Sequence, residues 1–309
     1  MVDVPSSPGP QAVPDEPGGA ANSSRRWIVG VVLTTVVNLA ATATTVGGLW
    51  LQKNSVDLER MEVVNAAVGK IHSSEDRDQA EGFGLLRDVM REEPEMQEVI
   101  LASVERYLRS PRPLGAEEIK GLTGTITRYV AIQGTQDAAE VIRARDPLKD
   151  QGGPGQRSFF LPGMKVDGVA FKDVVMRGTV ATGCYARWTI WNRADLGGSE
   201  FQECRFDGAQ FVGAKLNGVD FTGAFLKDAD FRDADLVGAN LNRAVLGGVD
   251  LKGANLRGAK FGKINFENVS FDGVESIAGA DFSQVKQIER AWNLRDAPGH
   301  ESAIWPPGS

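Results

Sequence analysis

The sequence predicts a mainly β protein whose C-terminal half is a solenoid, preceded by one apolar segment and a small α-helical region. The main observation is a period of five, because Leu or Phe stands at every fifth position from Phe221 to Leu241. A second observation is the uncharged run at residues 27–51, and a third is the helical spacing of apolar residues within residues 52–149. The chain therefore divides into an apolar segment, a helical region and a repeat.

The N-terminal residues predict a tail and a membrane anchor. Residues 1–24 are rich in Pro, Gly, Ser and Ala and are expected to be disordered. A helix over residues 27–51, at about 1.5 Å per residue, is long enough for a hydrocarbon core of about 30 Å. Trp27 and Trp50 stand near its two ends, where aromatic rings favour the membrane interface. The sequence therefore predicts one transmembrane helix in the lipid bilayer and a single-pass protein of the cell membrane.

An export signal is the alternative interpretation of this segment. Arg25 and Arg26 before the apolar run resemble a twin-arginine signal, and the small residues Ala41, Thr42 and Ala43 resemble a cleavage site. Basic residues also follow the segment, so the distribution of positive charge does not decide which side of the membrane holds the soluble part. The length of the run favours an uncleaved anchor, and the topology stays open.

Residues 52–149 carry apolar side chains at the spacing of amphipathic helices. Pro94 is placed to open a helix, and the pair Ser110 and Pro111 is placed to end it. The predicted segments are a helix at 56–71, a helix pair at 76–92 and 93–110, one or two further helices within 115–134 and 135–147, and a linker at 150–157.

Residues 158–283 form the repeat. Each unit of five has a large apolar residue at its centre and a small one two positions earlier, and its other positions are mostly polar or Gly. Side chains two apart lie on the same side of an extended backbone, so both apolar positions point into one core. The chain must then turn after every unit, and Gly two positions after many centres suits a tight corner. Rings closed in this way stack into a solenoid stabilised by contacts between neighbours.

The stretch ADLVGANLNRAVLGGVDLKGANLRGAKF, residues 234–261, resembles the pentapeptide-repeat proteins. This resemblance implies a right-handed quadrilateral β-helix with four units in each coil. Core residues twenty apart should then stack, as in the column Leu196, Leu216, Leu236 and Leu256. The order of anchor, helices and repeat is similar to that of membrane-anchored pentapeptide-repeat proteins of actinobacteria, whose biochemical role is generally undefined.

The last part of the chain predicts a cap. The frame of five breaks at Ser276, and residues 284–295 are expected to form a short helix that covers the last coil, followed by a tail at 296–309. A cap is needed because an open coil end exposes unpaired backbone groups.

Cys184 and Cys204 are twenty residues apart, and both hold the position of the small core residue. The stacking of coils would make them neighbours at a Cα separation within the disulfide range. Two interpretations are open, a disulfide or two small apolar side chains that pack where Ala usually stands. With two Cys and two His in the chain, no disulfide framework or metal site is expected.

One outward column is less polar than the others. Tyr185, Arg205, Phe225 and Val245 share the position before the centre at twenty-residue spacing. Aromatic residues and Arg are favoured in protein contacts, so this column is a candidate surface for a protein partner. The alternative is that the chain's own helices or linker cover it.

No candidate catalytic, cofactor-binding or metal-ligating residues are found, so the sequence does not predict an enzyme. The favoured function is a non-catalytic scaffold for an unknown protein partner. Some pentapeptide-repeat proteins are DNA mimics that inhibit a topoisomerase such as gyrase, which is the alternative function. Residues 158–285 have 16 acidic and 14 basic side chains, too balanced for mimicry of a polyanion. Nucleic-acid binding is not expected, whereas the family's end-to-end pairing makes a homodimer a further expectation.

Overall fold

The structure is a computed structural model, and the residues that it describes fall within one compact unit, Asp57–Ser309. None of the described helices is long and apolar enough to cross a membrane. The predicted tail at 1–24 and the predicted anchor at 27–51 lie outside the described residues, as do Trp27 and Trp50. The described ranges are 58–110, 116–121, 124–129, 133–150, 158–264, 266 and 268–308.

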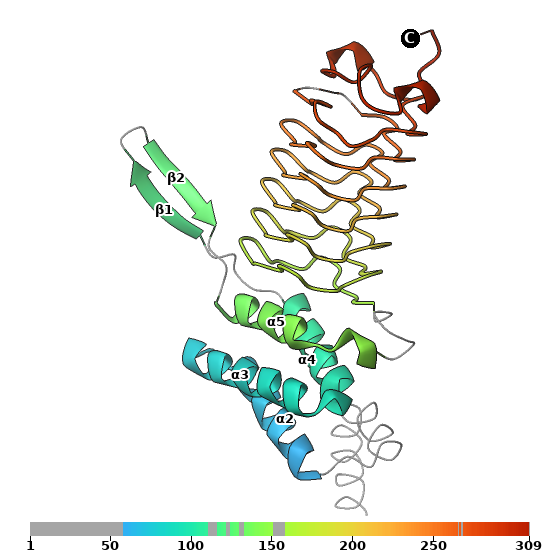
Figure 1. The fold of residues 1–309 in the computed structure, drawn as a ribbon. Coiled ribbons are helices and arrows are strands. Elements are labelled where there is room, and N and C mark those ends of the chain that lie inside the picture. The colour runs from blue at the N-terminus through green and yellow to red at the C-terminus, as the bar shows by residue number, and fades with distance from the viewer. Residues whose placement is uncertain are drawn as a thin grey trace, which may run out of the picture. The chain divides into compact units, whose positions relative to one another are not determined.

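Four α-helices precede the solenoid in the described part of the chain (Figure 1). The predicted helix pair is present, and a short 3-10 turn at Pro94–Met96 leads into its second member. The bounds are α2 at Leu58–Ile71, α3 at Asp76–Glu92, α4 at Gln97–Arg109 and α5 at Gln133–Ala144.

The helices pack through the apolar stripes that the sequence spacing predicted. In α3 the buried side chains Phe83, Leu86 and Met90 recur at intervals of three and four residues, which places them on one face. Gly82 on the same face lets α3 approach α2 closely, because a Cβ there would lie 2.8 Å from the carbonyl oxygen of Ala67. This small core gives the helices a fixed arrangement.

The prediction of helix within 115–134 is wrong for most of that stretch. The structure has a β-hairpin there, with β1 at Ala116–Gly121 and β2 at Gly124–Tyr129 paired antiparallel (Figure 1). The glycines at the inner ends of the strands disfavour a helix, and the Thr, Ile and Tyr residues of β2 favour extended backbone. The region at 52–149 is therefore helical with a hairpin inserted before α5.

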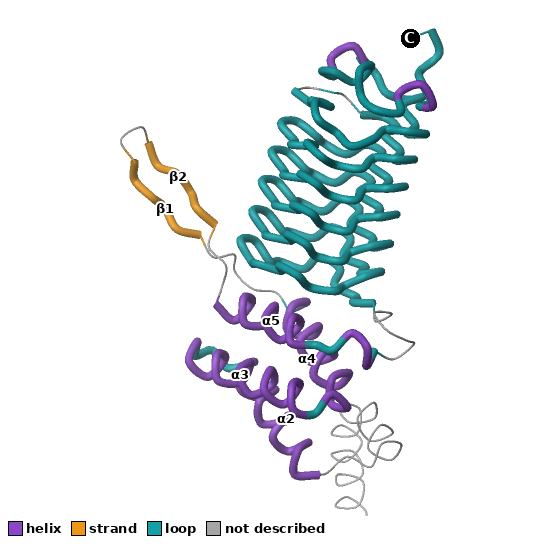
Figure 2. The backbone as a smooth tube through the Cα atoms, viewed as in Figure 1, coloured by secondary structure: helices purple, strands orange, loops and turns teal. Residues whose placement is uncertain are grey.

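From Phe160 onward the chain winds into successive coils (Figure 2). From Phe160 to Asn240 every fifth residue forms a parallel bridge to the residue twenty positions later, so a coil has four sides, as predicted; the later bridges, such as Asn255 to Ser276, span one to three residues more. In one side of one coil, the Arg205 N–H donates to the Cys184 carbonyl at 2.8 Å and the Phe206 N–H donates to the Phe225 carbonyl at 2.7 Å. Each side contributes a single bridging residue, so the described coils contain isolated bridges in place of extended strands.

The core consists of the stacked columns that the twenty-residue spacing predicted. The rings of Phe211 and Phe231 stack with centroids 4.9 Å apart, and those of Phe171 and Trp191 stack at 4.2 Å. The four leucines of the predicted column, Leu196, Leu216, Leu236 and Leu256, are all buried. Burial of this regular core, at about 25 cal/mol for each Å² of apolar surface, drives the coils together.

The predicted capping helix at 284–295 is wrong, because the described chain there has only one 3-10 turn, Ile288–Arg290. The ladder continues past the predicted boundary at 283, with Trp292 pairing with Ser270 and Ile304 pairing with Asp281. The residues predicted as a tail thus also belong to the coil. A short helix would leave the backbone edge of the preceding coil unpaired, whereas this irregular winding supplies its hydrogen-bond partners.

The N-terminal end of the solenoid is closed by side chains of α5. The amide of Gln136 accepts a hydrogen bond from the Ala170 N–H at 2.9 Å and donates one to the Ala170 carbonyl at 3.3 Å. Arg143 donates to the carbonyls of Ala170 and Lys172 at 3.2 and 2.9 Å. The first coil has no coil before it, so these bonds replace the missing backbone partners.

A buried ion pair completes this junction. Arg145 and Asp150 are each almost fully buried, and the guanidinium binds the carboxylate through two of its nitrogens. The same guanidinium donates to the carbonyl of Val175 at 2.6 Å and lies over the ring of Phe159. Asp150 was assigned to the linker by sequence, and the structure instead places it in the contact between α5 and the first coil.

We expect Arg145→Ala to destabilise the protein strongly, because it leaves the Asp150 carboxylate buried without the guanidinium that neutralises its charge. Loss of one partner of a buried pair costs about 3–5 kcal/mol. Chemical denaturation of the full chain, followed by circular dichroism, measures the change. Arg193→Ala is the matched control, since Arg193 binds Asp173 at the exposed surface and its loss should change the midpoint little. Equal midpoint shifts in the two variants would contradict the structural role of the buried pair.

Candidate functional site

The structure places the four residues of the predicted partner surface in one column on one side of the solenoid. Tyr185, Arg205, Phe225 and Val245 are joined by consecutive parallel bridges, so their side chains project from four neighbouring coils. Tyr185 and Phe225 each expose 37% of their surface and Val245 exposes 45%. All four side chains of this column are exposed in the structure.

The members of the column also contact one another. The guanidinium of Arg205 lies over the ring of Phe225, 4.9 Å from its centroid, which is a cation–π arrangement. Such a contact orients the long Arg side chain before any partner arrives, so less side-chain entropy is lost on binding. The column is therefore a partly apolar surface with one cation held in a fixed position.

Trp188 enlarges this surface and was missed from the sequence. It stands at the corner three residues after Tyr185, is 44% exposed, and has its indole close to the backbone of Gly208 in the next coil. Its φ of 53° lies in the left-handed region, where a bulky side chain costs about 1 kcal/mol or more. Gly holds this region at many other corners and polar residues such as Arg193 and Glu203 hold it at others, whereas Trp188 is the one aromatic residue with a positive φ among the described residues.

We call Tyr185, Trp188, Arg205, Phe225 and Val245 the aromatic face. Four ionisable side chains lie at the corner beside it, Arg187, Asp207, Lys227 and Asp228.

Asp207 is half buried, and burial raises the pKa of its carboxyl, although its own backbone N–H and the nearby Arg205 and Arg187 act in the opposite direction. Within the described part of the chain neither Asp207 nor Lys227 forms an ion pair. The edge of the aromatic face thus holds one acid and one base in adjacent coils, neither of which forms an ion pair with the described residues.

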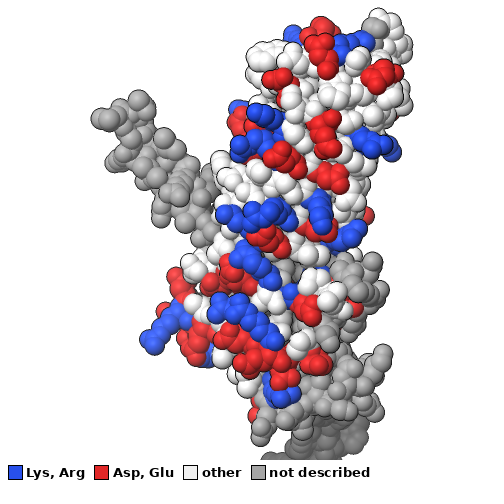
Figure 3. Space-filling view, viewed as in Figure 1, with Lys and Arg blue, Asp and Glu red and all other residues white. Residues whose placement is uncertain are grey.

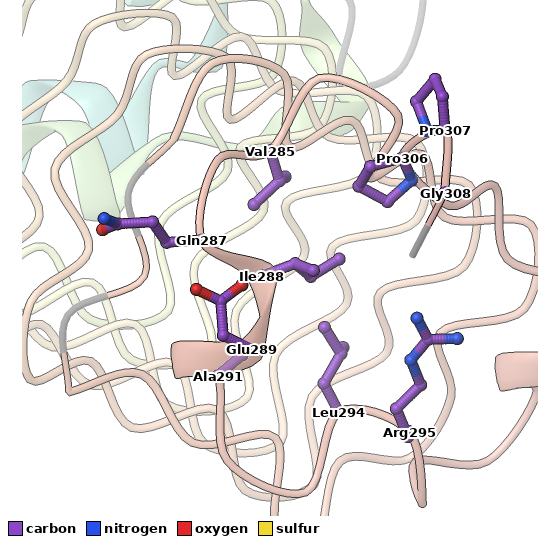
Figure 4. Close-up of a pocket in the computed structure, with 10 residues that line it drawn as sticks. All are labelled: Val285, Gln287, Ile288, Glu289, Ala291, Leu294, Arg295, Pro306, Pro307 and Gly308. Carbon is purple, nitrogen blue, oxygen red and sulfur yellow. The ribbon is translucent and has the colours of Figure 1, made fainter.

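A hollow lies near the C-terminal end, with a volume of about 530 Å³ (Figure 4). The side chains of Val285, Ile288 and Leu294 point toward its interior, while Glu289 and Arg295 stand at its rim. The guanidinium of Arg295 packs over Trp305, 4.1 Å from the ring centroid, which gives this cation a structural contact. The lining provides neither a nucleophile with a base nor a set of metal ligands.

No group of three or more His, Cys, Asp or Glu side chains that could hold a metal ion occurs among the described residues. His300, one of the two histidines, has its Nδ1 3.1 Å from the carbonyl of Ala297 within the last turn. Among the described surfaces, the aromatic face has the most features of a binding surface.

Comparison with protein families matches the repeat directly. Residues 186–261 match the model of a pentapeptide repeat region, and residues 250–286 match the model of pentapeptide repeats in eight copies. Residues 186–286 are a pentapeptide-repeat region, and we use the name pentapeptide-repeat domain for the solenoid that contains them. No curated protein matches the sequence. The right-handed quadrilateral β-helix that this family implies agrees with the four bridge columns of the structure.

Solved structures with a similar domain include three of known origin or description. A pentapeptide repeat protein from the thylakoid lumen of Arabidopsis thaliana is 38% identical over 31% of this chain and 63% of its own, with a TM-score of 0.24. HetL from the cyanobacterium Nostoc, a pentapeptide repeat protein involved in heterocyst differentiation regulation, is 19% identical over 48% of this chain and 86% of its own, with a TM-score of 0.24. QnrB1, a plasmid-mediated fluoroquinolone resistance protein, is 17% identical over 48% and 92%, with a TM-score of 0.23.

Cys184 and Cys204 lie in adjacent coils of the pentapeptide-repeat domain, with their Cα atoms 4.4 Å apart and their sulfurs joined in a disulfide. Both residues are fully buried. The sulfur of Cys204 also lies 2.7 Å from the carbonyl of Ala181. The bond links the two coils that carry Tyr185 and Arg205, so it holds the first half of the aromatic face together.

We expect replacement of both cysteines by Ala to lower the thermal midpoint of the oxidised pentapeptide-repeat domain. A disulfide that closes a loop of this length restricts the unfolded chain and contributes about 3 kcal/mol. Ala fits the small core position, so the packing cost of the change itself is low. Thermal melts of the full chain with and without dithiothreitol measure the effect. The double variant should be insensitive to reductant, and an equally insensitive unaltered protein would contradict the expectation.

Proposed function

We propose that the chain is a non-catalytic scaffold that binds a protein through the aromatic face of its pentapeptide-repeat domain. The observation that carries this proposal is the concentration of three half-exposed aromatic side chains and one oriented Arg on adjacent coils. Buried together, such residues are the ones that contribute most of the energy in protein interfaces. The proposal includes a membrane anchor at residues 27–51, which rests on the uncharged length of that segment.

The stiffness of the domain supports this function. Backbone hydrogen bonds of 2.7–3.0 Å connect the coil of Tyr185 to that of Arg205, and the coil of Arg205 to that of Phe225. The core beneath them is filled by stacked rings, including those of Phe201 and Phe221. A surface built on such a framework changes little on binding, so most of its contact energy is available for affinity.

The charge pattern disfavours the alternative function, a DNA mimic that inhibits a topoisomerase such as gyrase. Acidic and basic side chains alternate over the face that Figure 3 shows. Arg193 donates a hydrogen bond to Asp173, which lowers the pKa of that carboxyl. Burial acts to raise the pKa of Asp230, but hydrogen bonds from Arg232 hold it below its usual value. These carboxylates are neutralised by bound guanidinium groups, whereas mimicry of DNA needs a dense unpaired negative field.

A photo-crosslinking experiment tests the binding face. We expect benzoylphenylalanine at position 225 to give discrete protein adducts in cells, because that side chain would be buried in the contact. The same group at position 237 is the control, since Val237 is 38% exposed but lies at a different corner of the coil. Adducts at both positions to the same extent, or at neither, would argue against the aromatic face as a binding surface.

A fractionation experiment tests the anchor. The full chain should stay with the membrane pellet after an alkaline carbonate wash, because burial of 25 uncharged residues, 27–51, resists extraction. A variant that lacks this segment should move to the supernatant. If the full chain were extracted as readily as the deletion variant, the proposed anchor would be wrong.

A further inference from the structure

We propose that the partner of the aromatic face is a second copy of this chain, bound side by side with its coils running in the opposite direction. This inference rests on the proposed function, because it names the partner of that same surface. It commits to one arrangement, in which a two-fold axis crosses the aromatic face between the coil of Arg205 and the coil of Phe225. The evidence is the complementarity of the residues that this axis brings together.

The first evidence is the order of residues along the column. Because the bridge positions are evenly stacked, reversal about this axis sets Arg205 against the partner's Phe225 and Tyr185 against the partner's Val245. The Arg205 cation thus faces an aromatic ring, and the Tyr185 ring faces an aliphatic side chain. Each pair occurs twice, because a two-fold contact is self-complementary.

The second evidence comes from the corner beside the column. The same axis sets Asp207 against the partner's Lys227, an acid against a base, and neither has an ion pair within its own described chain. The pKa of Asp207 is raised by burial, so its carboxylate gains from an approaching cation. The indole of Trp188, which lies over Gly208, faces the partner's Asp228, whose carboxylate accepts hydrogen bonds.

The opposite corner adds no conflict. There Glu203 faces the partner's Gly223, and Gln202 faces the partner's Thr222. At the positions named, the arrangement sets no like charge directly opposite another, and the partner's Asp228 lies beside the Lys227 that Asp207 faces.

Neighbouring arrangements lack this complementarity. An axis through the coil of Arg205 would set Arg205 and Asp207 against their own copies, and an axis through the coil of Phe225 would set Lys227 against itself. Parallel coils would again oppose Arg205 to Arg205. Like charges in such positions cost several kcal/mol.

A shift by one coil toward the N-terminus would set Asp207 against the partner's Arg187. That guanidinium is already bound to Asp167 at 2.6 Å, and the shift would leave Val245 outside the contact. The axis between Arg205 and Phe225 is therefore preferred.

The size of the contact predicts a weak dimer. Four coils extend over about 15 Å at roughly 4.8 Å per coil, which is short of the surface that a tight dimer buries. Association should accordingly depend on concentration and on ionic strength, because the Asp207–Lys227 contacts lie at its edge.

Analytical ultracentrifugation of the full chain in mild detergent tests the inference. We expect the weight-average protein mass to rise from monomer toward dimer with concentration. Asp207→Lys and Lys227→Asp should each weaken association about tenfold or more, because each sets like charges together in both symmetric contacts. An equimolar mixture of the two variants should regain the dimer, since a mixed pair restores an acid against a base at both places. Lys252→Asp, at an exposed corner away from the aromatic face, is the control and should associate like the unaltered chain.

Mixing the two charge variants distinguishes the proposed contact from other ways in which the chain could associate. Association through residues 27–51 would be the same in all variants, and the shifted axis would give no recovery on mixing, so either result overturns the inference. A chain that stays monomeric at all concentrations also overturns it. If such a monomer still gave adducts with another protein at position 225, the proposed function would stand without a self-contact. If position 225 gave no adducts either, both would fall.

Discussion

The fold depends on backbone hydrogen bonds between one coil and the next. Each side of a coil supplies one bridging residue, so no coil is complete without neighbours on both sides. The two ends then become the weak points, and the chain closes them in different ways. At the N-terminal end, Gln136 and Arg143 form the hydrogen bonds that the backbone of a preceding coil would otherwise form. At the C-terminal end, Trp292 and Ile304 continue the series of parallel bridges in an irregular winding.

The repeat could be predicted from the sequence because its cause is local. A five-residue unit places two apolar side chains inside and forces a turn, and this holds for any unit whatever its neighbours. The closures of the two ends could not be predicted in the same way. They depend on whether a side chain such as Gln136 reaches the backbone at Ala170, thirty-four residues away, which no periodicity encodes. The hairpin at β1 and β2 was missed for a simpler reason, since helical spacing was weighed above the glycines at Gly121 and Gly124.

The candidate site also combines residues that the repeat spacing predicts with residues that only the three-dimensional structure identifies. The column from Tyr185 to Val245 follows from the twenty-residue spacing, and the structure stacks it as that spacing requires. Trp188 and Asp207 were missed because corner residues point outward in every unit and so carry no periodic signal. Only the three-dimensional structure shows that the Trp188 ring leans over Gly208 and that Asp207 is half buried beside it. A bulky aromatic residue where the other corners favour Gly is the sequence signal that could have identified this position.

A stacked repeat makes self-association sensitive to the sign of single charges. Because equivalent positions recur at every coil, a like charge repeated along a column would oppose itself in any antiparallel pairing about that column. With an acid at Asp207 and a base at Lys227, opposite charges meet when the axis lies between the coils of Arg205 and Phe225. Like charges meet when the axis passes through either of those two coils. The same two residues thus favour a contact and fix its register. Stiffness adds to this selection, since coils held by their backbone cannot shift to relieve a mismatched pair. The register is therefore the property on which exchange of Asp207 and Lys227 should act most directly.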